Sequence, residues 1–189
     1  ISLARGHDRL MDKAIYFFDA KFADGTVFQS DCSMQENLRL GMRKKANMTI
    51  IMNAPDPDIF YPGETESHHE HAKIKIIANS WSSNTRKGFD IFQFLDEHLD
   101  FGKYEMSFYG NSSVPFKNIR MCKPCASAEL AQKLRESDLF INASLYEACS
   151  NSLLEALHCG VPAVVRASSS DKEIVGCGGG VYEGSHDVL

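Results

Sequence analysis

Short apolar runs alternate with amphipathic stretches along most of the chain, and the alternation is most regular from residue 73 onward. Continuous apolar runs predict buried strands, whereas apolar residues three or four positions apart predict helices. We expect strands at 73–79, 104–109, 119–122, 138–142, 162–166 and 180–182. We expect helices at 88–98, 127–136, 150–158 and 171–175. This order predicts a Rossmann-like α/β fold, a parallel sheet with helices on both faces.

The N-terminal third shows a shorter version of the same pattern. It predicts a strand at 25–29, a helix at 32–40 closed by Gly41, and a strand at 48–52. Three prolines then fall within eight residues, which excludes both a helix and an internal strand. We therefore predict the end of an N-terminal domain at 1–53, an interdomain linker at 54–72 and a second α/β domain at 73–189.

Composition and charge narrow the class of protein. The 189 residues are 43% hydrophobic and carry a net charge of −5, which is typical of a soluble globular protein and argues against a nucleic-acid partner. No apolar run approaches the roughly 18 to 20 residues of a membrane span, and residues 1–10 lack the apolar core of a signal peptide. We expect a cytoplasmic protein. Because the chain starts at Ile1 and stops at Leu189 inside an apparent helix start, we expect it to be an internal piece of a longer protein.

Two segments have compositions that could bind a metal. Cys122 and Cys125 have metal or redox spacing, but a zinc site needs a second such pair and the chain has none. We interpret all six cysteines as structural thiols. His68-His69-Glu70-His71 lies in the predicted linker, and we interpret it as solvated. We expect no metal and no cofactor.

Folds of this class bind ligands where strands end, near a topological switch point. After the strand at 73–79 comes a polar loop, 79–88, which contains Trp81 and the adjacent cations Arg86 and Lys87. Hydroxyls, amides and fixed positive charge suit a phosphate group. A solvated loop in which Ser83 or Asn84 caps the next helix is the alternative.

Two further strand ends carry candidate chemistry. Gly110 permits either a plain turn or a close backbone approach to a ligand. The helix predicted to begin near Ser150 would offer its N-terminal N–H groups to an anion, with Glu147 before it and Glu155 within it. In an alternative interpretation, Ser152 and Glu155 form a capping box.

Residues 73–183 resemble the donor-binding domain of the retaining, GT-B-fold glycosyltransferases of the group 1 family. Arg86-Lys87-Gly88 is similar to the family's basic pair and glycine before a helix, and Gly110 to the glycine ending the next strand. Residues 130–144 resemble the family's segment of helix, hydrophobic strand and serine. Glu147 and Glu155 match its paired glutamates, and residues 155–164 its Glu-Ala to Gly-x-Pro stretch. Upstream, residues 50–62 are similar to the crossover from the acceptor domain.

The resemblance implies transfer of a hexosyl-type sugar, with retention, from a nucleotide diphosphate-sugar to an unknown glycan, lipid or small-molecule acceptor. It implies that Lys87 binds the diphosphate, which is the leaving group, together with Ser150 and the N–H groups around Asn151, Ser152 and Leu153. Glu155 would accept hydrogen bonds from the ribose, and Glu147 would act near the donor sugar. Lys87 and Glu147 are the expected catalytic residues.

One departure from the family bears on Arg86. The family usually has a Gly-Arg unit after the first strand, where this chain has Ser80, Trp81 and Ser82. Arg86 replaces that arginine as a hypothesis, which an unchanged rate in Arg86→Ala would contradict. A non-catalytic nucleotide- or glycan-binding module is the alternative function. We expect the 189-residue chain to be inactive alone, with any peripheral membrane contact made through an N-terminal domain outside it.

Overall fold

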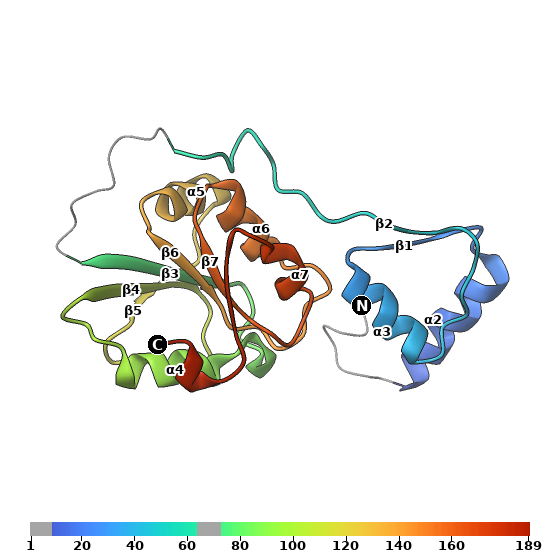
Figure 1. Cartoon of the computed structure of the whole chain (residues 1–189), viewed down its shortest axis with the longest axis horizontal. Coiled ribbons are helices and arrows are strands. Elements are labelled where there is room, and N and C mark those ends of the chain that lie inside the picture. Colours follow the sequence, from blue (N-terminus) through green and yellow to red (C-terminus); the bar gives the residue numbers. More distant parts are fainter. Residues whose placement is uncertain (1–8, 64–72) are drawn as a thin grey trace.

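A computed structural model describes residues 9–63 and 73–189 and contains two α/β units (Figure 1). The smaller unit consists of α2 (Arg9–Phe22), β1 (Thr26–Phe28), α3 (Asp31–Arg39) and β2 (Met48–Ile50). Strands β1 and β2 pair in parallel, and α3 connects them. Helix α2 was not predicted, although its sequence is amphipathic. Its Leu10, Phe18 and Phe22 are all more than half exposed.

The larger unit is built on six parallel strands. They are β3 (Ile74–Ser80), β4 (Tyr104–Gly110), β5 (Arg120–Cys122), β6 (Leu139–Asn142), β7 (Ala163–Arg166) and β8 (Gly179–Tyr182). Their order in the sheet is β5-β4-β3-β6-β7-β8. This is the order of doubly wound nucleotide-binding sheets, and its switch point lies between β3 and β6. The predicted fold class is confirmed.

Helices cover both faces of this sheet (Figure 1). Helices α5 (Ser127–Arg135), α6 (Asn151–His158) and α7 (Asp171–Val175) lie on one face, and α4 (Phe89–His98) lies on the other. Ile77 and Phe140 pack into the first core, while Ile76 and Ile141 on the same strands pack into the second. Strands buried on both faces explain the continuous apolar runs in the sequence. Two short 3₁₀ turns complete the unit, η1 (Thr85–Lys87) and η2 (Ser185–Asp187).

The segment between the units contains neither helix nor strand over residues 51–63, as its prolines predict. Part of it nevertheless packs on the larger unit. Phe60 is buried in the core under α5 and α6, and the Arg135 guanidinium lies 4.5 Å above the Tyr61 ring. Residues 64–72, including the His68–His71 cluster, lie outside the described residues, so the linker bounds stay a prediction.

Hydrogen bonds tie α7 of the larger unit to the smaller unit, and the start of α6 to the segment between the units. The Glu173 carboxylate accepts the backbone N–H groups of Asp31, at 2.9 Å, and Cys32, at 3.1 Å, where α3 begins. Asn53 Nδ2 donates to Asn151 Oδ1 at 2.7 Å. Among the described helices, none has the length and apolar character needed to cross a bilayer.

Candidate donor site

Two loops meet at the switch point, one after β3 and one after β6. The Leu145 N–H donates to the Arg86 carbonyl at 2.8 Å, which ties the loops together. Gly88 has φ +77°, and a Cβ added there would lie 1.9 Å from the Ala143 carbonyl oxygen. Only glycine fits such a close approach in this backbone conformation.

Gly88→Ala should therefore destabilise the larger unit by about 2 kcal/mol, through backbone strain and the steric clash with Ala143. Urea unfolding measures this change. Gly180→Ala is the matched control, because the nearest atom to a Cβ there lies 4.0 Å away. Equal unfolding free energies for the two variants would contradict the close approach.

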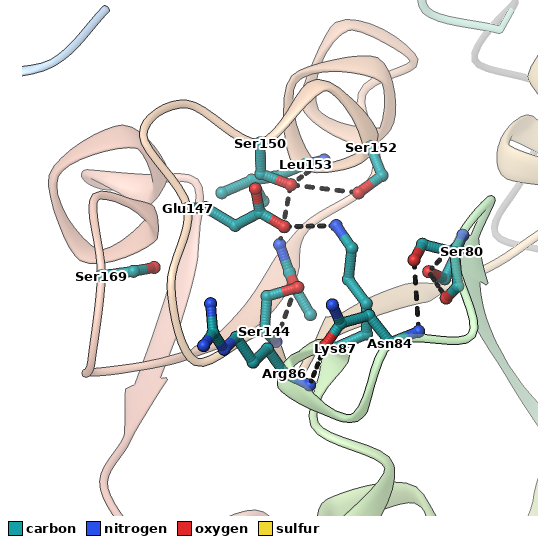
Figure 2. A network of polar contacts seen from close by, with 12 residues as sticks. Ser80, Asn84, Arg86, Lys87, Ser144, Glu147, Ser150, Ser152, Leu153 and Ser169 are labelled. Atoms are coloured by element: carbon teal, nitrogen blue, oxygen red, sulfur yellow. Dashed lines mark hydrogen bonds and ion pairs between the residues drawn. The ribbon is translucent and has the colours of Figure 1, made fainter. Parts of the chain in front are cut away.

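The loops bring an ion pair into the space between them. Lys87 on η1 and Glu147 after β6 join through Nζ and Oε1 (Figure 2). Their side chains are 31% and 14% exposed, so the pair remains accessible. Figure 2 shows the Arg86 side chain extending in a different direction from Lys87. The structure thus separates the two adjacent cations.

Helix α6 begins beside this pair. The Ser150 hydroxyl accepts the Leu153 N–H at 3.4 Å, lies 3.0 Å from the Ser152 hydroxyl and accepts from Asn142 Nδ2 at 3.0 Å (Figure 2). The Leu153 N–H, predicted as a donor to ligand, is thus directed to Ser150, and the Leu153 side chain is fully buried. Since Ser150 is the N-cap, Glu155 is the fifth helical residue, and the capping box with Ser152 is wrong.

A cleft of 260 Å³ opens at these loops. Six predicted residues line it: Lys87, Glu147, Ser150, Asn151, Ser152 and Glu155. The remaining lining residues are Asn79, Ser80, Trp81, Ser82 and Cys149. Arg86, Gly110 and Leu153 are not among the lining residues.

Gly110 lies beside the cleft rather than in it. It borders a neighbouring slot of 10 Å³, together with Trp81, Pro124 and Cys125. Its φ is +124°, and a Cβ there would lie 1.9 Å from the Ser80 carbonyl oxygen. Gly110 therefore allows the ends of β3 and β4 to approach each other closely. Its predicted role in donor binding stays a prediction.

Glu155 separates the cleft from a second one of 490 Å³, which Asn53, Pro55 and Phe60 also line. Burial raises the pKa of Glu155 to about 7. Near neutral pH this carboxyl can therefore either donate or accept a hydrogen bond.

A buried polar network behind the ion pair was not predicted. Asp171 is fully buried at the start of α7, and its Oδ2 accepts from Asn142 Nδ2 at 3.1 Å. Asp171 Oδ1 is buried with no hydrogen-bond partner within residues 9–63 and 73–189. Burial, and then the negative charge of Glu147, raise the pKa of Asp171 to about 7.

Of Asn142 and Asp171, only Asn142 could have been recognised from the sequence. Asn142 is a polar residue at the end of a buried strand, where ligand-binding groups gather in such folds. Asp171 resembles any acid in the first turn of a helix, and its burial depends on how α7 packs over β6 and β7.

The described parts of the chain contain no group of three His, Cys, Asp or Glu side chains placed to hold a metal ion. The accessible Lys87 ammonium, the hydroxyls of the cleft and the N-terminus of α6 can hold an anion by charge and hydrogen bonds.

Residues 108–186 match the family model of the group 1 glycosyl transferases. The group 1 match includes Gly110, Glu147, Glu155 and Asp171, whereas Lys87 and Trp81 precede it. No curated protein sequence matches the chain at a significant level.

Solved glycosyltransferases share the fold. The sucrose-phosphate synthase of Thermosynechococcus elongatus has a TM-score of 0.77 and 15% identity, over 97% of this chain and 51% of its own. HepE of Anabaena, solved with UDP and glucose, has a TM-score of 0.78 and 15% identity, over 98% of this chain and 56% of its own. The C-terminal domain of a group 1 family protein (LpcC) from Francisella tularensis has a TM-score of 0.56 and 18% identity, over 71% of this chain and 84% of its own. The chain thus has a GT-B-type fold and spans about half the length of the first two proteins.

Proposed function

We propose that this chain carries the donor site of a glycosyltransferase that moves a sugar from a nucleotide diphosphate-sugar to an acceptor, with retention of configuration. The observation that carries the proposal is the Lys87–Glu147 pair beside the start of α6, at the switch point of the sheet. Nucleotides bind at this point in doubly wound folds.

The diphosphate would lie between Lys87 and the first residues of α6. Negative charge develops on the diphosphate as the sugar leaves, and a fixed cation stabilises that charge without reorganising water. Asn151 and Ser152 line the same cleft and would add hydrogen-bond donors. Ser150 holds this helix start in place through its bonds to Asn142 and Leu153.

The two glutamates would hold the sugars at either side of the diphosphate. Glu155, at the border of the two clefts, would bind the ribose hydroxyls. Glu147 would face the donor sugar and stabilise positive charge at its anomeric carbon. Since Glu147 is bound to Lys87 in this structure, donor binding would have to release the ammonium toward the diphosphate.

Thermal unfolding of the chain with a panel of nucleotides tests this proposal. The panel starts with UDP and UDP-glucose, because the similar Anabaena protein was solved with UDP and glucose. GDP, ADP, TDP and CMP follow. A nucleotide at 100 times its dissociation constant stabilises a protein by about 2.7 kcal/mol, which raises the midpoint by about 5 °C or more at this size.

Above about pH 7, where Glu155 is ionised, Glu155→Gln should reduce this ligand-induced shift, since a charged acceptor binds ribose hydroxyls more strongly than an amide does. Glu97→Gln, an exposed glutamate on α4, should keep the full shift. No shift with any nucleotide, in a chain shown by circular dichroism to be folded, would contradict the donor site.

One observation favours a non-catalytic binding module as the second candidate. Among the described residues, Lys87 is the one cation that lines the 260 Å³ cleft, and Ser80, Trp81 and Ser82 occupy the loop where the group 1 resemblance implies an arginine. Nucleotide binding without sugar transfer by the complete protein would favour this module.

A further inference from the structure

Trp81 is the one large apolar side chain among the residues that line the 260 Å³ cleft. It directly follows β3, and its side chain is 62% exposed. Tryptophan is a highly buried residue on average, so an exposed indole in a polar loop is informative. Its backbone is fixed, because Asn111 Nδ2 donates to the Trp81 carbonyl at 2.8 Å and the Asn111 N–H donates to the Ser80 carbonyl at 2.8 Å.

Trp81 lines two neighbouring hollows. On one side it shares the 260 Å³ cleft with Lys87 and Glu147. On the other it borders the 10 Å³ slot, whose other walls include Gly110, Pro124 and Leu130. The slot has room for about one water molecule, so a larger ring would lie across its mouth, against the indole.

We infer that Trp81 is the stacking platform for the nucleobase of the donor, and so a specificity-determining residue. The inference rests on the proposed function, which places the diphosphate at Lys87. A nucleobase, which the ribose joins to that diphosphate, would find a flat surface for stacking at the indole and the slot, away from the ion pair. Stacking of a base on an aromatic ring contributes roughly five- to a hundredfold in affinity.

The chain reports on this contact directly, because Trp81 is its single tryptophan. Titration with UDP, GDP or ADP should quench the Trp81 emission in a saturable way. Inorganic pyrophosphate, which has the phosphates without the base, should bind without moving that emission.

Variants of Trp81 distinguish a loss of base stacking from a general disturbance of the fold. By calorimetry, Trp81→Ala should bind the preferred nucleoside diphosphate at least tenfold more weakly and leave pyrophosphate affinity unchanged. Trp81→Phe, which keeps an aromatic ring, should bind the same nucleotide with an affinity within about threefold of that of the chain without substitutions. Tyr146→Ala is the matched control, since Tyr146 is 47% exposed on the other loop and does not line the cleft.

Two results would overturn the inference while the donor site stands. One is unchanged nucleotide affinity in Trp81→Ala, and the other is an equal loss for nucleotide and pyrophosphate. If no nucleoside diphosphate binds the unchanged chain, the proposed function fails and this inference fails with it. Unfolding midpoints within about 1 °C of each other show that the variants fold.

Discussion

Lys87→Met should weaken the binding of a nucleoside diphosphate about a hundredfold, whereas Glu147→Gln should strengthen it. Two unit charges about 5 Å apart at the edge of a protein interact by roughly 3 kcal/mol, which corresponds to about a hundredfold in affinity. Lys87 contributes this attraction to the diphosphate. Glu147 opposes it, both by its own negative charge and because it holds the Lys87 ammonium in the ion pair.

The opposite signs make this pair of variants a sharp test, because a general disturbance of the cleft would weaken binding in both. Calorimetry at fixed ionic strength gives both affinities. Lys103→Met is the control, since that side chain is 77% exposed at the start of β4 and does not line the cleft. Weaker binding in Glu147→Gln would contradict the competition between carboxylate and diphosphate.

In the complete enzyme, Glu147→Gln should bind donor more tightly and transfer sugar more slowly. A carboxylate beside the donor sugar stabilises the positive charge that develops at the anomeric carbon, and an amide cannot. The variant would then separate binding from catalysis, which the non-catalytic alternative does not expect.

The sheet and the position of the site follow from local sequence patterns. Buried parallel strands read as continuous apolar runs, and the polar residues directly after β3 and β6 reach the same edge of the sheet. This is why Lys87 could be predicted to line one cleft with Glu147 and Glu155, although it lies 60 positions before Glu147 in the chain. The sequence marks Gly88 and Gly110 as glycines beside a helix start and a strand end, but their close approaches to Ala143 and Ser80 are seen only in the structure.

Tertiary contacts decide which side chains and N–H groups face the cleft, and the sequence pattern alone does not predict these contacts. Arg86 and Lys87 are adjacent cations, and the charge of either could bind a phosphate. The geometry of η1 directs Lys87, and not Arg86, to the cleft. The Leu153 N–H is directed to Ser150 because Asn142 and Ser152 hold that hydroxyl, a contact among three separate positions. Helix α2 has an amphipathic sequence and was missed by the prediction, and its Leu10, Phe18 and Phe22 are exposed in the structure.

Asp171 should make the chain less stable as the pH rises from about 4 to about 7. Its native pKa is raised to about 7 from the ordinary value of 3.8. In this interval the folded chain therefore keeps a proton that the unfolded chain has lost, and the free energy of unfolding falls as the pH rises. The contribution is fully present below about pH 4 and is lost by about pH 7. A shift of this size corresponds to at most about 4 kcal/mol.

Asp171→Asn should remove this dependence, because an amide keeps an oxygen to accept from Asn142 Nδ2 and does not ionise. Urea unfolding at pH 4.5, 5.5, 6.5 and 7.5 would show the two stabilities converging, or crossing, as the pH rises. Asp58→Asn, at an exposed aspartate, should follow the unchanged chain in parallel. Parallel curves for Asp171→Asn would mean that Asp171 is ionised in the folded chain at every pH tested. Asp171 would then add a second negative charge beside Glu147, and the site would be a poorer receptor for a diphosphate than proposed.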